Sequence, residues 1–156
     1  MINNTFFRLA FCALLSSTLF TQANAAAMPP QPPAYIVIPV GTALSISLNA
    51  EVYAEELSVG NAIEFKVRGD VRVNDKVVVA HGSRATGMIT KIRKACDGQC
   101  SEITFTAEEV QAIDGSMIEL NSTPHIVKAP CCNGSASATI NTLVRANTLD
   151  EEHIKD

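Results

Sequence analysis

The feature that most constrains the fold is an alternation of apolar and polar residues that begins near Ile36 and recurs in short segments. In "TALSISLN", the apolar residues Leu44, Ile46 and Leu48 would share one face, and "NAIEFKVR" repeats the pattern. Such a period of two is typical of β-strands. Turn residues separate these segments at intervals of about 8 to 12 residues, and no long helical period precedes about residue 136. The sequence therefore predicts an all-β fold, a small single-domain barrel or sandwich of short antiparallel strands and hairpins.

One hairpin is expected in "DVRVNDKVVV". A three-residue loop of residues 74–76 would place Val71 and Val73 opposite Val79 and Val77, all on one face. A two-residue loop would instead mix these valines with charged neighbours, so we favour the longer loop.

Two further hairpins follow. "ATGMITKIRK" and "SEITFTAEEV" would pair around "CDGQC", and Asp114-Gly115 in "QAIDGSMIEL" favours a type I′ turn. In "AHGSR", Gly82 provides the positive φ that a polar turn needs. Near the C-terminus, "ATINTLVRANT" is compatible with a closing strand or a short helix.

The chain begins like a secretory signal peptide. Arg8 precedes an apolar run that ends near Phe20, and small residues follow in "ANAAA". The run is shorter than the roughly 20 apolar residues that a membrane-spanning helix needs. We expect cleavage after Ala25, or alternatively after Ala27, and a location in the periplasm or outside a bacterial cell.

The domain organisation follows from these segments. Residues 1–25 would be the signal peptide, 26–35 a proline-rich leader, 36–146 the β-domain and 147–156 a polar, frayed tail. The formal net charge is −4, and −5 without Arg8, so no basic stripe for nucleic acid is expected.

Four cysteines would remain after cleavage: Cys96, Cys100, Cys131 and Cys132. An even number in an oxidising compartment favours disulfides. A two-residue turn at 97–98 would place Cys100 opposite Ala95, and the next strand would bring residue 129 or so beside Cys100. All four sulfur atoms would then cluster at one end of the domain.

The connectivity of these cysteines stays open. We expect two bridges between the 96–100 tip and the 131–132 segment rather than Cys96–Cys100 with a vicinal Cys131–Cys132 ring. The alternative is a periplasmic metal-handling module, because four thiolates suit Zn²⁺ or Cu⁺.

No catalytic constellation is visible, so we expect a non-enzymatic protein without a cofactor. His81 is expected in a solvated turn, and His125 and His153 lie far from it in the sequence. The paired carboxylates Glu108 and Glu109 would point to opposite faces of a strand, or flank a bulge.

A pattern of turn and strand positions runs through roughly residues 36–120. It comprises Gly41, Thr42, Asp70, Val71, Gly82, Ser83, Arg84, Gly87, Asp114, Gly115, Ile118 and Leu120. This pattern resembles the C-terminal β-domain of TrbI-like conjugal-transfer proteins, the scaffold subunits of type IV secretion core complexes, and small secreted bacterial proteins of unassigned function.

The resemblance implies a β-barrel with an assembly, envelope-scaffold or binding role, and protein partners in the bacterial envelope. In that family a helical hairpin lines an outer-membrane pore. The matching segment here, "TPHIVKAPCCNGSASA", is too short and too polar to cross a bilayer. We therefore expect assembly or binding without a pore, and no transmembrane segment in the mature chain.

Overall fold

The computed structural model describes residues 33–95, 99–129 and 134–156, which belong to one compact unit. The expected signal peptide, its cleavage sites and the leader up to residue 32 lie outside this part of the chain. Within it there is no helix, and hence none long and apolar enough to cross a membrane. The all-β prediction is confirmed.

The described residues form short strands joined by turns. In chain order these are β1 Tyr35–Ile38, β2 Ala43–Leu48, β3 Val52–Tyr53, β4 Ala62–Val67, β5 Val71–Val73, β6 Lys76–Val79, β7 Arg84–Arg93, β8 Glu102–Gln111, β9 Met117–Ser122, β10 His125–Lys128, β11 Ser137–Ala138, β12 Leu143–Thr148 and β13 Glu152–Lys155.

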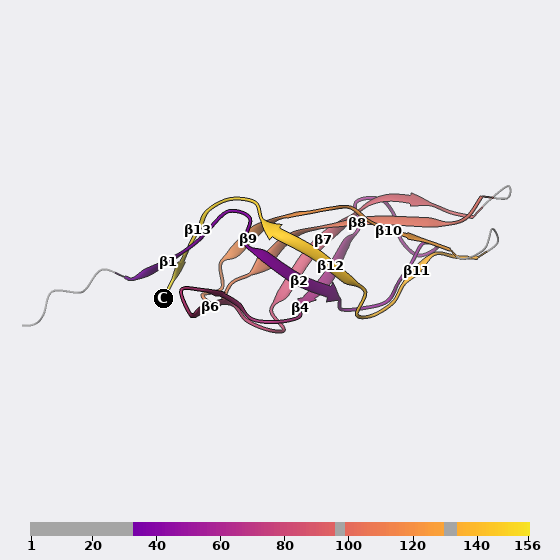
Figure 1. Cartoon of the computed structure of the whole chain (residues 1–156). Helices are drawn as coiled ribbons and strands as arrows, with labels where there is room; N and C mark the ends of the chain where they lie inside the picture. The colour runs from indigo at the N-terminus through magenta and orange to yellow at the C-terminus, as the bar shows by residue number, and fades with distance from the viewer. Residues whose placement is uncertain (1–32, 96–98, 130–133) are drawn as a thin grey trace, which may run out of the picture. The chain divides into compact units, whose positions relative to one another are not determined.

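Six of these strands close into an antiparallel barrel through the pairing of β8 with β9, and Figure 1 shows how they are arranged. The ring runs from β2 through β4, β7, β8, β9 and β12 and back to β2. Closure leaves no free edge within the ring. Because β2 and β8 are three positions apart in either direction, they lie on opposite sides of the barrel.

The barrel core is formed by the residues that the alternation predicted. Leu44, Ile46 and Leu48 of β2 are buried, and the inward residues of β4 are buried in the same way. The rings of Phe65 and Phe105 lie near each other inside, with centroids 6.0 Å apart. The expected core faces of β2 and β4 are therefore confirmed, whereas in the 71–79 hairpin the most buried residue is Val78 rather than one of the four valines expected on the core face.

Strand β8 belongs to the barrel and also to an extension beyond it. Its second half pairs with β9, whereas its first half pairs with β10, which places Lys128 opposite Glu102. Between β9 and β10 lies Pro124, which lacks a backbone N–H and interrupts the pairing. The result is a three-stranded extension, β7–β8–β10, that ends where the cysteines are expected.

The β5–β6 hairpin differs from our prediction. Val73 pairs with Lys76, so the loop has two residues, Asn74 and Asp75, both with positive φ of 50° and 64°. Such a turn matches the twist of the strands, and Asn and Asp tolerate this conformation. A bulge after Val71 then restores its pairing with Val79. The predicted three-residue loop is wrong.

The β8–β9 turn also corrects our prediction. Gly115 has a φ of 88°, but Asp114 does not have a positive φ, so the turn is not of type I′. The Gly115 amide donates to the Ala112 carbonyl at 3.1 Å, and the Ala112 amide donates to Ser116 at 2.9 Å. The loop therefore comprises residues 113–115. The Asp114 carboxylate favours this geometry because it accepts hydrogen bonds from Ser116.

The C-terminal segment is a strand rather than the predicted frayed tail. β13 pairs with β1, with Tyr35 opposite Lys155, and Ile154 is only 1% exposed. The apolar Ile154 packs into the core, which explains why an otherwise polar segment is ordered. Before it, β12 is the closing strand, so the strand alternative for "ATINTLVRANT" is confirmed.

Candidate functional site

The residues of the TrbI-like pattern do not converge on one site. Thr42 and Asp70 line the same groove beside β2, whereas Gly87 lies within the β7–β8 pairing. Asp114 and Gly115 lie in the β8–β9 turn. Their contacts show local structural roles for most of them.

Thr42 and Asp70 secure two turns. The Thr42 hydroxyl donates to the Pro39 carbonyl at 2.6 Å. Asp70 accepts a hydrogen bond from the His81 backbone N–H at 2.9 Å and another from Arg72 at 3.3 Å. The His81 hydrogen bond is the main reason that the pKa of Asp70 is lowered. His81 itself is exposed in its turn, as expected.

The second turn of the pattern contains Gly82, Ser83 and Arg84. Gly82 has the expected positive φ, of 81°. Its amide and that of Ser83 donate to backbone carbonyls, and Arg84 forms an ion pair with Glu64. These contacts connect the β6–β7 turn to β4.

Gly87 is required by space rather than by its backbone conformation. A Cβ atom at this position would lie 2.0 Å from the Thr106 carbonyl oxygen and 2.9 Å from the Phe65 ring. The register of β7 and β8 shifts beside it, since Thr86 pairs with Glu109 while Gly87 pairs with Ala107. Glu108 is therefore the extra residue of a bulge. For Glu108 and Glu109, the structure thus has the bulge that we gave as the alternative to a regular strand.

Only one of the four candidate cysteines, Cys100, lies among the described residues, where it is half-buried. Cys96, Cys131 and Cys132 lie outside them, so neither the bridges nor their connectivity is described. The pairing of the strands beside Cys100 agrees with the expectation that residue 129 or so lies next to it. The Ala129 amide donates to the Ser101 carbonyl at 3.0 Å, which brings the chain after β10 alongside Cys100.

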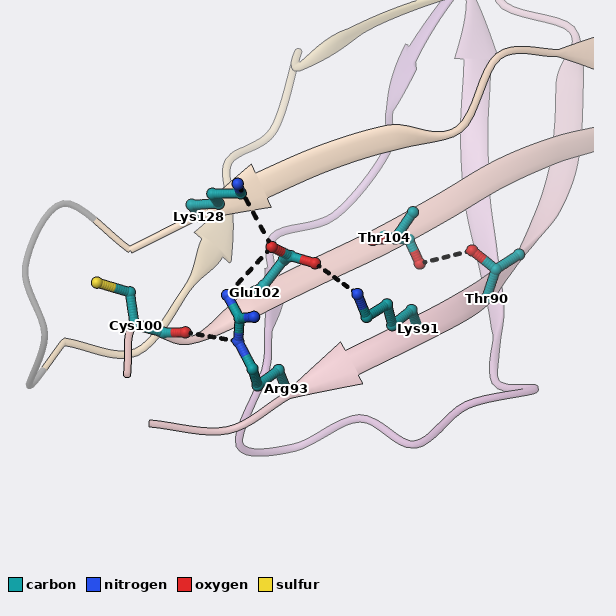
Figure 2. Close-up of polar contacts among 7 residues, drawn as sticks. All are labelled: Thr90, Lys91, Arg93, Cys100, Glu102, Thr104 and Lys128. Atoms are coloured by element: carbon teal, nitrogen blue, oxygen red, sulfur yellow. Dashed lines mark hydrogen bonds and ion pairs between the residues drawn. The ribbon is translucent and has the colours of Figure 1, made fainter. Parts of the chain in front are cut away.

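Next to Cys100, the outward face of the extension carries a charged cluster around Glu102 (Figure 2). The Glu102 Oε1 atom lies 3.2 Å from Lys91 Nζ. Its Oε2 atom lies 3.2 Å from Arg93 and 3.6 Å from Lys128. Arg93 also donates through Nε to the Cys100 carbonyl at 3.1 Å. We call Lys91, Arg93, Glu102 and Lys128 the Glu102 cluster.

The register of the extension places these side chains together. Arg93 and Lys128 lie directly opposite Glu102 on its two neighbouring strands, so the three point to the same face. Lys91 joins them because a register shift between Ile89 and Lys91 makes Thr90 an extra residue in β7. Ile89 faces the core, and the bulge turns Lys91 outward.

The Glu102 carboxylate is largely covered although its strand face points away from the core. Its side chain is 7% exposed, whereas those of Lys91 and Lys128 are about 60% exposed. The hydrogen bond from Lys91 is the main cause that lowers the pKa of Glu102, so the group stays ionised. The cluster thus holds one anion beneath three cations.

This arrangement favours binding of anionic groups over proton transfer. A carboxylate that is already ion-paired is a poor general base, whereas each lysine has three donors and uses few of them here. Sequence reasoning did not single out Glu102. Part of the Glu102 cluster could have been predicted from "TKIRK", where cations occupy alternate positions after an apolar segment. The bulge that places Lys91 on the same face as Glu102 has no such signal in the sequence.

The three histidines lie on separate elements. His125 is the first residue of β10 and packs on Phe105, with ring centroids 5.2 Å apart. His153 of β13 lies 3.5 Å from Glu151. Among residues 33–95, 99–129 and 134–156, no group of three or more His, Cys, Asp or Glu is placed to hold a metal ion.

A scan against protein-family models finds no match to this chain, and a search of curated proteins finds none either. The resemblance to TrbI-like scaffolds therefore rests on the sequence pattern alone.

Proposed function

We propose that this protein is an exported, non-enzymatic β-domain that binds a protein partner in the bacterial envelope, in an assembly or scaffold role. The observation that carries the proposal is the Glu102 cluster, in which three cations surround one covered carboxylate on the outward face of β7–β8–β10. Export is inferred from the signal-peptide pattern of the first 25 residues.

The cluster favours recognition over stability. Covered ion pairs contribute little net stability, because the loss of hydration offsets much of the attraction between the charges. What Glu102 provides is position. It holds Lys91, Arg93 and Lys128 on one face with an excess of positive charge, on a chain whose overall charge is negative. Such a fixed cationic face fits an acidic partner surface.

Site-specific photo-crosslinking in intact cells tests this function. A photoreactive residue in place of Lys128 should give a discrete adduct with one envelope protein. The same residue in place of Asp75, in the exposed β5–β6 turn, is the matched control. Adding Glu102→Gln should weaken the adduct because the cations lose their common anchor. Equal adducts at both positions, or none at Lys128, would contradict the proposal.

A periplasmic metal-handling module is the second candidate, since the pairing of Ala129 with Ser101 favours the expected clustering of cysteines. Purification from the periplasm distinguishes the two functions. Four free thiols with stoichiometric bound metal would support metal handling, and disulfides without metal would exclude it.

A further inference from the structure

The outward side of β2 forms the floor of a furrow on the side of the barrel opposite β8. Its outward residues are all small, namely Ala43, Ser45 and Ser47. Arg145 of β12 lies directly opposite Ser45, and on the other side the Arg68 amide donates to the Ser45 carbonyl at 2.9 Å. Two arginines therefore flank one serine in a row across three chain segments.

Two hollows follow this strand. The larger, of about 680 Å³, is lined by Ser45, Asp70, Arg72, Arg145 and Asn147 among others. The smaller, of about 280 Å³, is lined by residues that include Ser47, Lys66, Arg68, His81 and Asn141. Together they extend along both halves of β2, and the larger is within the size range of ligand pockets.

The positive charge of the furrow is not balanced by the acids beside it. Glu64 is ion-paired with Arg84, and Asp70 with Arg72. No ion pair of Lys66, Arg68 or Arg145 is found in the part of the chain that the structure describes.

The register places these three cations on the two sides of β2, with Arg145 and Arg68 flanking Ser45 and Lys66 opposite Ser47. Arg68 is fixed by a hydrogen bond of 3.0 Å to Asn141, and Lys66 lies two residues before it on the same face of the chain. Like charges on adjacent strands repel each other, and a bound anion would reduce this repulsion. Charge complementarity therefore indicates an anionic ligand.

The dimensions indicate an extended chain. Arg145 lies on β12 and Arg68 directly follows β4, so their backbones, on the two sides of β2, are about 10 Å apart. An extended peptide laid over β2 would therefore have one arginine on each side. No Phe, Tyr or Trp among the described residues lines either hollow, and His81 at the smaller one is the only aromatic ring that these residues contribute to the linings, so they form no extended stacking platform for nucleic-acid bases. A flat bilayer surface would not follow a furrow whose floor residue Ser47 is 2% exposed.

We propose that this furrow binds an extended acidic peptide segment of a partner protein, with carboxylates on Arg68, Arg145 and Lys66. It lies on the opposite side of the barrel from the Glu102 cluster, and neither proposal depends on the other. A domain with both surfaces would join two partners.

Fluorescence anisotropy with the mature chain tests the furrow. The probe is a short labelled peptide of alternating glutamate and serine, compared with a version in which glutamine replaces glutamate. The acidic peptide should bind and the neutral one should not. Arg68→Gln combined with Arg145→Gln should weaken binding roughly ten- to hundredfold, because charge-assisted hydrogen bonds are lost. Binding should also weaken as ionic strength rises.

Lys94→Gln combined with Lys155→Gln is the matched control, since it removes the same charge from exposed positions that line neither hollow and lie outside the Glu102 cluster. This pair should leave peptide affinity within about twofold. Equal losses in both double variants would show an effect of net charge only and would overturn the proposal. Absence of binding by the unmodified chain would overturn it as well.

Other occupants give distinct results. The unmodified chain could instead bind inorganic polyphosphate or phosphatidylglycerol vesicles but not the peptide. If the Arg68→Gln and Arg145→Gln double variant then lost that binding, the furrow would be a phosphate site and the proposal would be overturned. Self-association that the arginine pair abolishes would indicate a second copy of the chain instead. In the unmodified protein, peptide-induced amide shifts at Ser45 and Ser47, measured by NMR, would support the furrow without relying on any variant.

Discussion

The side chain of Asp114 connects the β8–β9 turn to the C-terminal strand. Its Oδ2 atom accepts a hydrogen bond of 2.9 Å from the backbone N–H of Lys155, 41 residues further along the chain. Its Oδ1 atom accepts from the Ser116 hydroxyl at 2.6 Å and from the Ser116 amide at 3.0 Å. These hydrogen bonds, the one from the Ser116 side chain first, lower the pKa of Asp114 to about 2.

The Asp114 contacts predict a specific dependence of stability on pH. Because the pKa is lower in the folded state, the ionised group stabilises the fold above its ordinary pKa of 3.8, and this contribution disappears as the pH falls towards about 2. Asp114→Asn should therefore lower the thermal unfolding midpoint at neutral pH. The difference in midpoint between this variant and the unmodified chain should become smaller as the pH falls from 3.8 towards about 2.

Asp150→Asn is the control for this titration, since Asp150 is exposed and makes no side-chain hydrogen bond or ion pair that the structure describes. It should change the unfolding midpoint little at neutral pH. A difference between Asp114→Asn and the unmodified chain that stays constant down to pH 2 would contradict the assigned role.

Gly87→Ala should destabilise the barrel by at least about 2 kcal/mol, because the new methyl group would collide with backbone atoms of β8 that have no space to move. Gly69→Ala is a matched control, since a Cβ at Gly69 has nothing within 4 Å. Urea unfolding of both variants measures the difference. Similar stabilities would mean that β7 and β8 are not packed as closely as the structure shows.

Glu102→Gln should weaken the β7–β8–β10 extension, because Lys91, Arg93 and Lys128 would then repel one another without an anion between them. Hydrogen exchange at the amides of β10 should become faster, while exchange in β2 should not change. Glu109→Gln, an exposed position on the same strand, should have no such effect. Unchanged exchange in β10 would show that the three cations do not repel one another when the Glu102 charge is removed.

The β5–β6 hairpin provides a test of burial. Val78 is 0% exposed, so Val78→Asp would bury an unpaired charge and should cost more than about 4 kcal/mol, enough to unfold a domain of ordinary stability. Val73→Asp should cost less, because Val73 is half-buried. Arg72→Gln should be nearly neutral. Circular dichroism of the three variants would contradict the assignment if Val73→Asp were the most severe.

The cysteine prediction concerns residues mostly outside the described part of the chain. Non-reducing proteolysis with mass spectrometry should find a peptide containing "CDGQC" joined to one containing "CCNG". A bridge that closes a loop of about 30 residues is worth about 3 to 4 kcal/mol. Reduction should therefore lower the unfolding midpoint clearly. Bridges confined within each peptide would contradict the predicted connection between the segments.

Turn chemistry shows how far local sequence reasoning reaches. Glycine positions were predicted correctly at Gly82 and Gly115 because positive φ is a local property. The turn types were wrong in both hairpins, since a two-residue turn occurs at Asn74-Asp75 and a three-residue loop at 113–115. Bulges and side-chain hydrogen bonds decide between these turns, and both depend on partners that the local sequence does not specify.

The sequence by itself determined the all-β class and the core faces of regularly alternating strands such as β2, because a period of two assigns Leu44, Ile46 and Leu48 to one side without knowledge of any partner. Only the tertiary structure decided that the sheet closes into a ring, that Ile154 orders a polar tail, and that Arg145 and Arg68 flank Ser45. The physical reason is distance along the chain. Alternation is a property of neighbouring residues, whereas closure and register depend on contacts between segments tens of residues apart.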